Sequence, residues 1–311
     1  MEQKYISLRD YVGKALNAAK VEFPNITVID SDLDTSTRAH EFAVEHPESF
    51  VELGIAESSA VSLAMGMAGE GMIPFYVNFA IFVTGTSWTQ LRQACYENAN
   101  VKILGTHPGM DDGPDGASHH ANEDLAITRV IPNMTVLVPS NEKEVMQAVK
   151  LACEIDGPVY IRVARDLVPE RESKTVFVSG EAEIVESDGY DVALVYEGTA
   201  AKQAHEVFEE LSNAGKKVTL VNIRSLKPID KILIKEMAKK TERFATIENH
   251  TVIGGLGGAI AEELSSFSNS VKLMRFGVQD EFTESGKTAD VKKKYGLDSD
   301  KIVVSILDEL Q

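Results

Sequence analysis

Cysteine is scarce in this sequence. Only Cys95 and Cys153 occur among 311 residues, and they do not form a CxxC pair. This count excludes a disulfide framework and a cysteine-based zinc cluster, and it fits a reducing compartment. The N-terminal stretch MEQKYISLRDYVGKAL lacks the apolar core of a signal peptide, and no apolar run is long enough to span a bilayer. We therefore expect a cytoplasmic protein.

Positive charge is also in short supply. Lysine and arginine number 31 against 48 acidic residues, which gives a formal net charge of −17. This balance argues against a nucleic-acid backbone or an anionic membrane as a partner. If the protein binds a phosphorylated molecule, a few focused cations must provide the site.

Two series of alternating strand and helix patterns are present, and a length of 311 residues favours two domains. Alternation of this kind predicts a parallel sheet with helices on both faces. A charged, weakly periodic segment, 166–188, is interpreted as the linker. We therefore predict an α/β fold of two domains, 1–175 and 186–311, each a mostly parallel sheet with helices on both faces. The expected strands are 26–30, 50–53, 73–77, 101–105, 134–138, 159–163, 192–196, 217–222 and 243–247, and the expected helices include 8–19, 57–68, 79–98, 142–154, 229–239 and one from 298.

Two short motifs in the first series have both a structural and a functional interpretation. In ELGIAESS, Glu57 begins a predicted helix, where a carboxylate commonly serves only to complement the helix dipole. Its apolar neighbours could instead desolvate it and hold a proton on it. In NFAIFV, Phe79 and Phe82 are three residues apart and are expected to share a helix face. They could be core residues, or they could stack on a flat heteroaromatic ring.

The segment THPGMDDGPDGASHH follows a predicted strand, at the edge of the sheet where open α/β proteins bind ligands. It contains three of the seven histidines and three aspartates, which favours a functional loop over a simple turn-rich connection. A zinc site is a poor interpretation, because the spacing is irregular and no cysteine joins. Further along, Arg165 follows a strand end and could bind a phosphate or form a surface ion pair.

The glycine-rich segment GGLGGA precedes a predicted helix in the second series. A GxG start suggests a nucleotide site, which would fit a nucleotide-binding oxidoreductase. However, the segment lies in the third strand–helix unit of its series and lacks the full fingerprint. We therefore favour close strand–helix packing as its role.

The order of these motifs resembles that of the transketolase family. GIAE, then FxxF, then TH followed by DGxxH, then a strand ending in Arg, is similar to the family's pyrimidine-binding domain. VNIRSLKPID and ENHTVIGGLGGAIAEEL are similar to its C-terminal domain. The resemblance covers essentially the whole chain, which corresponds only to the C-terminal half of a full-length transketolase.

The resemblance implies a thiamine diphosphate site. Glu57 would bond N1′ of the cofactor's aminopyrimidine, favouring the tautomer that removes the thiazolium proton. Phe82 would stack on the aminopyrimidine. The other residues implied at the cofactor are Phe79, Asp32, Leu33 and Ile55.

On the substrate side, the resemblance places His119 at the reacting hydroxyl of the donor and Asp115 at the neighbouring one. Because the loop is longer than usual, Asp112 competes with Asp115, and His120 competes with His119. Gly85 stands where full-length enzymes often carry an aromatic residue. The terminal phosphate of the sugar would be bound by Arg9, Ser36, His107 and Arg165.

The sequence contains no GDG motif, with which the family binds the diphosphate through Mg²⁺. The resemblance therefore implies a partner, an N-terminal transketolase subunit that holds Mg²⁺ and the diphosphate, in an α₂β₂ heterotetramer. No metal ligand is expected in this chain. The activity implied is transfer of a two-carbon ketol unit from a ketose phosphate, such as xylulose 5-phosphate, an unusual pentose or a sulfo-sugar, to an aldose.

Three alternatives remain open. The chain could be the β subunit of a 2-oxoacid dehydrogenase, but such an enzyme does not need the four-residue phosphate set. It could be part of a deoxyxylulose-phosphate synthase, although those usually keep both halves on one chain. It could also be a non-catalytic paralogue that binds or regulates a partner, against which the retention of Glu57, Phe82, His107, His119 and Arg165 argues.

Overall fold

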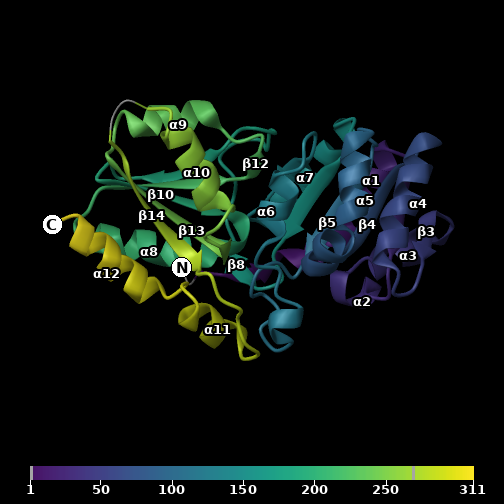
Figure 1. Cartoon of the computed structure of the whole chain (residues 1–311), viewed down its shortest axis with the longest axis horizontal. Coiled ribbons are helices and arrows are strands. Elements are labelled where there is room, and N and C mark those ends of the chain that lie inside the picture. The colour runs from purple at the N-terminus through teal and green to yellow at the C-terminus, as the bar shows by residue number, and fades with distance from the viewer. Residues whose placement is uncertain (1–2, 268–269) are drawn as a thin grey trace.

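A computed structural model of the chain describes residues 3–267 and 270–311, and two α/β lobes lie side by side in it (Figure 1). The first domain contains a seven-stranded sheet in the order β12-β6-β7-β5-β4-β2-β3. All neighbouring strands are parallel except β12 and β6. The predicted parallel sheet is confirmed. Its strands are β2 (Ile26–Asp30), β3 (Phe50–Glu52), β4 (Ile73–Phe79), β5 (Lys102–Thr106), β6 (Thr135–Leu137), β7 (Val159–Val163) and β12 (Ser225–Lys227).

Helices cover both faces of this sheet. Neighbouring residues of one strand, such as Val28 and Ile29, belong to opposite hydrophobic layers because successive side chains point to opposite faces. Helices α1 and α7 pack on the layer that contains Val28, whereas α4 and α5 pack on the other. The helices are α1 (Val12–Glu22), α2 (Asp34–Thr37), α3 (His40–Glu45), α4 (Glu57–Gly69), α5 (Trp88–Tyr96), α6 (Asp124–Arg129) and α7 (Glu142–Glu154).

The second domain has a five-stranded sheet in the order β14-β13-β10-β11-β9, in which only β9 is antiparallel to its neighbour. Helices α8 and α12 pack on one face, and α9 and α10 on the other. Its strands are β9 (Glu183–Ser187), β10 (Val192–Glu197), β11 (Val218–Ile223), β13 (Arg243–Thr251) and β14 (Lys272–Val278), and its helices are α8 (Ala201–Asn213), α9 (Lys231–Ala238), α10 (Leu256–Leu264), α11 (Thr288–Lys294) and α12 (Ser299–Glu309).

The segment 166–188, interpreted from the sequence as the linker, contains regular structure at both of its ends. Its start forms β8 (Leu167–Pro169), which pairs with β1 (Tyr5–Ser7), and its end forms β9 in the second sheet. In addition, β12 lies between the two lobes (Figure 1) and joins the sheet of the first domain by pairing with β6. The two domains are therefore joined by shared sheet structure as well as by the connecting chain.

Local sequence explains the helix whose bounds were predicted most closely. Asn141 caps α7, because its side chain accepts a hydrogen bond from the backbone N–H of Glu144 at 2.9 Å. The Glu144 carboxylate in turn accepts from the backbone N–H of Ser140 at 2.7 Å, which completes a reciprocal cap. These bonds fix the start of α7 at the position that the sequence predicts.

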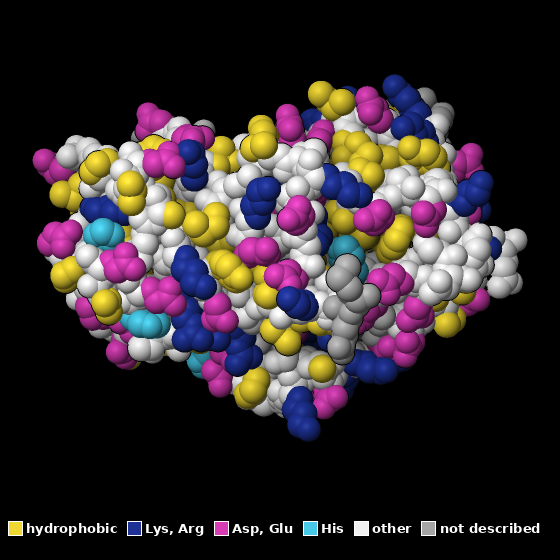
Figure 2. Space-filling model, turned by 180° about the vertical axis from the view of Figure 1, so that it is seen from behind, with side chains coloured by type: hydrophobic (Ala, Val, Ile, Leu, Met, Phe, Trp, Pro, Cys, Tyr) yellow, Lys and Arg dark blue, Asp and Glu magenta, His cyan; other side chains and the backbone are white. Residues whose placement is uncertain are grey.

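The surface carries both signs of charge. On the face seen in Figure 2, acidic and basic side chains are interspersed over both domains. Among the residues that the structure describes, no helix has both the length and the apolar character needed to cross a bilayer.

Candidate active site

The predicted site residues follow the carboxyl ends of adjacent parallel strands. Asp32 follows β2, Glu57 follows β3, Phe79 ends β4, His107 follows β5 and Arg165 follows β7. In an open parallel sheet these ends share one edge, which is where such folds bind ligands. The fold therefore gathers at one edge segments that lie far apart in the sequence.

Four aromatic rings gather at this edge. Phe79 and Phe82 are stacked, with ring centroids 6.1 Å apart and planes 11° apart. The His107 ring lies 3.9 Å from that of Phe79. The half-buried His119 presents its ring edge-on to both phenylalanines, at 6.4 Å from Phe79 and 5.4 Å from Phe82. This arrangement creates an aromatic surface that could pack against a flat ring.

The prediction that Phe79 and Phe82 share a helix face is wrong. Phe79 is the last residue of β4, where it pairs with Thr106 of β5, and Phe82 begins a short π-helical turn, Phe82–Thr86, before α5. Their rings meet because the chain turns between them. Gly85 lies in this turn, and a Cβ added there would meet only the Ile81 side chain, at 3.7 Å.

Cationic side chains lie beside the aromatic surface. Arg9 comes from a short 3₁₀ helix, Leu8–Tyr11, and its Nη1 lies within hydrogen-bonding reach of Nε2 of His107, at 3.3 Å. The same Nη1 donates to the backbone carbonyl of Ser36 at 3.2 Å. Burial, together with the nearby Arg9, Arg165 and His119, lowers the pKa of His107 to about 2. Three of the four residues predicted to bind phosphate are thus in direct contact, and Arg165 is close enough to act on His107.

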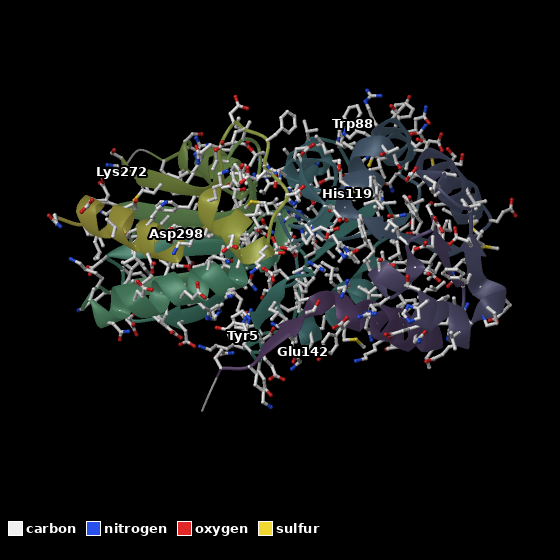
Figure 3. The ribbon with its side chains drawn as sticks, turned by 90° about the horizontal axis from the view of Figure 1, so that it is seen from below. Tyr5, Trp88, His119, Glu142, Lys272 and Asp298 are labelled. Carbon is white, nitrogen blue, oxygen red and sulfur yellow. The ribbon has the colours of Figure 1, made fainter. Side chains whose placement is uncertain are left out.

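The loop after β5 separates the two histidines that the sequence left ambiguous. The ring of His120 is buried, with Nδ1 2.5 Å from the Thr283 hydroxyl and Nε2 3.0 Å from the backbone carbonyl of Asp112. It therefore joins this loop to the second domain. His119 is the one that lies beside the phenylalanine pair, on the side of the first domain that faces the second (Figure 3).

The two aspartates of this loop differ in exposure. Asp112 is buried and Asp115 is exposed. Burial, followed by the adjacent carboxylate of Asp115, raises the pKa of Asp112 to about 6.

The remaining predicted residues lie at the neighbouring strand ends. Glu57 is half-buried at the first turn of α4, and Ser58 next to it donates to the carbonyl of Thr86 at 3.2 Å, which joins α4 to the π-helical turn. Ile55 is 79% exposed. Within the described parts of the chain, no hydrogen bond or ring contact joins Glu57 or Ile55 to His107 or His119.

Two carboxylates that the sequence analysis missed hold Asp32 and Leu33. Asp30 accepts the backbone N–H of Leu33 at 2.7 Å, and Glu52 accepts that of Asp32 at 3.0 Å. Asp32 has a left-handed backbone, with φ of 61°. Burial raises the pKa of Asp30 to about 7. Its position at the end of β2, in register with Glu52 at the end of β3, is the sequence signal that could have identified the pair.

The glycine-rich segment of the second domain has the structural role that the sequence favours. The Glu248 carboxylate accepts the backbone N–H groups of Leu256 at 2.6 Å and Gly257 at 2.9 Å, at the start of α10. A Cβ on Gly255 would lie 2.1 Å from Glu248 Oε2. A side chain thus occupies the helix end where a nucleotide phosphate would bind, which removes the basis for a nucleotide-binding oxidoreductase.

No group of three or more His, Cys, Asp or Glu side chains in residues 3–267 and 270–311 is arranged to hold a metal ion.

Comparisons with known proteins match both domains. Residues 4–171 match the pyrimidine-binding domain of transketolase, and residues 180–302 match the transketolase C-terminal domain. The chain is 37% identical to a putative transketolase C-terminal section of Methanocaldococcus jannaschii, over 99% of this chain and 97% of that protein. It is 33% identical to one subunit of an apulose-4-phosphate transketolase of Phocaeicola vulgatus, over 91% of each chain.

The solved structure described as a split gene transketolase, an inactive beta4 tetramer, superimposes on the chain with a TM-score of 0.90. It is 41% identical, and the match covers 98% of each chain. This protein therefore belongs to the transketolase family, and it corresponds to the C-terminal section of the enzyme.

Proposed function

We propose that this chain is the catalytic C-terminal subunit of a two-chain, thiamine-diphosphate-dependent transketolase that acts on phosphorylated sugars. The observation that carries the proposal is the cluster of Phe79, Phe82, His107, His119 and Arg9 at the carboxyl edge of the first sheet. The phenylalanine rings suit a flat heteroaromatic ring, and Arg9 with His107 suits a phosphate.

The residues present fit one end of the cofactor. Phe79 and Phe82 offer stacked rings, and Glu57 is a half-buried carboxyl group at a helix start, where it can bond a ring nitrogen. When bound, thiamine diphosphate supplies the nucleophilic carbon and the electron sink for two-carbon transfer. Asp32, Leu33 and Ile55 are assigned to the same site. Because the sequence lacks GDG, Mg²⁺ and the diphosphate are assigned to the partner subunit.

The substrate end has a proton-transfer group and an anion site. His119 is half-buried beside the aromatic rings and can exchange a proton with a sugar hydroxyl, while the exposed Asp115 can accept a hydrogen bond from the next hydroxyl. Arg9, Ser36, His107 and Arg165 are assigned to the terminal phosphate. His107 is neutral and accepts a hydrogen bond from Arg9, so the two guanidinium groups supply the charge.

This cationic group favours a sugar phosphate over pyruvate, and so favours a transketolase over a 2-oxoacid dehydrogenase subunit. A relative named for apulose 4-phosphate supports a phosphorylated ketose. That a related split-gene chain forms a beta4 tetramer described as inactive supports the requirement for an N-terminal partner, for which we propose an α₂β₂ heterotetramer in the cytoplasm.

The test combines this chain with the N-terminal subunit, thiamine diphosphate and Mg²⁺, and measures two-carbon transfer from xylulose 5-phosphate. Glu57→Gln should lower kcat by more than about 100-fold, because an amide keeps the shape of the side chain but cannot exchange a proton with the ring nitrogen. Glu70→Gln is the matched control, since Glu70 is exposed at the other end of the same helix and should leave kcat unchanged. Normal turnover by Glu57→Gln, with the fold verified by circular dichroism, would refute the assignment.

A further inference from the structure

Asp111, in the loop after β5, joins the two domains through its carboxylate. The side chain is fully buried. Its Oδ1 accepts hydrogen bonds from two residues of the second domain, Asn249 at 2.8 Å and Lys292 at 2.7 Å. Its Oδ2 accepts the backbone N–H groups of Arg165 at 2.8 Å and Asp166 at 3.0 Å. Both oxygens are therefore occupied, and they face opposite domains.

The same residue also holds the side chain of Arg165. Arg165 Nη1 donates to the backbone carbonyl of Asp111 at 2.9 Å. Asp111 thus binds Arg165 at two points, the backbone and the guanidinium group. The positive charge of the same guanidinium group reaches His107 at the candidate phosphate site, where it helps to lower the pKa of that histidine.

Lys292, on α11, supplies the charge that keeps Asp111 in place. Its ammonium group is buried and also bonds Asp166 Oδ2 at 2.8 Å. Burial alone would lower the pKa of Lys292, but Asp111 and Asp166 raise it, and the net pKa is raised. The lysine is therefore charged at neutral pH. Without it, Asp111 would be a buried carboxylate with no cation on Oδ1, which is strongly unfavourable.

We propose that Lys292, acting through Asp111, is a positioning residue for Arg165, so that the second domain determines how tightly the first domain binds phosphorylated substrates. The inference rests on the proposed function in one respect, namely that Arg165 contacts the phosphate. Lys292 touches neither substrate nor cofactor, and its effect is confined to the orientation of Arg165.

A purely structural role for Lys292 is the alternative, and Lys227 provides the matched control. Lys227, on β12, also joins the domains, because its ammonium group donates to the backbone carbonyls of Arg129, at 2.9 Å, and Ile131. It makes no hydrogen bond to Asp111 or Arg165 in the described parts of the chain. Replacing either lysine by methionine removes an interdomain contact, but only Lys292→Met disturbs Arg165.

The first measurement is binding of inorganic phosphate to the full chain by calorimetry, which does not require turnover. Lys292→Met should raise the Kd for phosphate about tenfold, which corresponds to about 1.4 kcal/mol. Lys292→Arg, which keeps the charge, should recover part of that loss. Lys227→Met should stay within about twofold of the wild-type Kd, even if urea unfolding shows equal destabilisation by both methionine variants.

The second measurement uses the complex with the N-terminal subunit. Lys292→Met should raise KM for the phosphorylated donor about tenfold, with kcat changed less than about threefold, because phosphate binding acts equally in the ground and transition states. The KM for an unphosphorylated ketose should be unchanged.

An unchanged phosphate Kd in Lys292→Met, or an equal loss in Lys227→Met, would overturn the inference while leaving the proposed function intact. If Lys292→Met does not fold, Asp111→Asn gives the same test, because the amide of Asn has one acceptor oxygen and an NH2 donor in place of the second, so it cannot accept from both domains. A wild-type chain that binds no phosphate and transfers no two-carbon unit with its partner would instead overturn the proposed function, and the inference with it.

Discussion

His107 shows how one residue of the site is fixed by its neighbours. Because Arg9 can only donate, Nε2 of His107 must accept, so the proton lies on Nδ1 and is donated to the Thr106 hydroxyl at 2.8 Å. The backbone of His107 is left-handed, with φ of 55°. Such a conformation is unfavourable for a residue other than glycine and is concentrated at functional sites. The surrounding bonds thus hold a neutral imidazole against the aromatic surface.

This environment predicts an acid-sensitive contribution to stability. The pKa of His107 is about 2 in the folded chain and about 6.5 when unfolded. Below pH 6.5 the unfolded state therefore binds a proton that the folded state does not, and the free energy of unfolding falls by up to about 1.4 kcal/mol per pH unit on acidification. His107→Gln removes the imidazole that takes up this proton. The free energy of unfolding of the variant, measured in urea, should therefore fall less steeply than that of the wild type between pH 6 and pH 4.5.

His205→Gln is a suitable comparison, because His205 is half-buried in the second domain and its pKa is lowered only to about 4, mainly by burial. Its removal should reduce the pH dependence only between about pH 6.5 and pH 4, whereas the effect of His107→Gln should continue below pH 4. Identical slopes for the wild type and His107→Gln would show that the His107 ring is protonated in the folded chain.

At the residue scale, the sequence predicted which residues follow the strand ends better than it predicted which side chains those residues contact. Resemblance brought Arg9, Ser36, His107 and Arg165 into one predicted site, and the structure places the first three in contact. The resemblance could not decide between His119 and His120, because their different positions depend on the contact of His120 with Thr283, which lies far along the chain in the second domain. The roles of Asp111 and Asp30 were missed for the same reason, since each depends on bonds formed only after folding.

At the scale of elements, most strands and helices follow from local patterns, and the errors lie where tertiary pairing decides. The helix predicted from Phe79 fails because β4 continues to Phe79 alongside Thr106 of β5. The sequence patterns did not predict β14 or α11, and the reason is again tertiary pairing. β14 is completed by pairing with β13, and α11 is anchored by the contacts of Lys292.

The start of α10 offers a test in which two glycines of one segment have opposite surroundings. A Cβ on Gly255 would collide with Glu248 Oε2, whereas a Cβ on Gly258 would meet nothing within 4 Å. Gly255→Ala should therefore lower the free energy of unfolding by about 1–3 kcal/mol through overpacking. Gly258→Ala, inside the helix, should raise it by about 0.5–1 kcal/mol. Urea unfolding of both variants decides, and equal effects would show that Glu248 does not cap this helix.

At the scale of the whole molecule, the sequence predicted two domains but not how firmly they are joined. Besides the segment interpreted as the linker, β12 enters the first sheet, and the loop after β5 is bonded to β13 and α11. Such contacts join segments that are distant in the sequence, so no local pattern reports them. The site in the first domain is therefore supported by the second.

Arg162, on β7, is the centre of this connection. Its guanidinium group is fully buried, bonds both carboxylate oxygens of Asp124 at 2.7 and 2.9 Å, and bonds Glu197 of the second domain at 3.1 Å. Arg162→Met would leave two buried carboxylates without their cation, so the free energy of unfolding should fall by about 3–5 kcal/mol. Lys150→Met, which removes only the exposed pair with Glu22, should change it by less than about 1 kcal/mol. The measurement is urea unfolding, followed separately by the fluorescence of the single Trp88 in the first domain and by far-ultraviolet circular dichroism, which also shows whether the two domains still unfold together. If the unfolding free energy of Arg162→Met falls no more than that of Lys150→Met, the buried network does not hold the domains together.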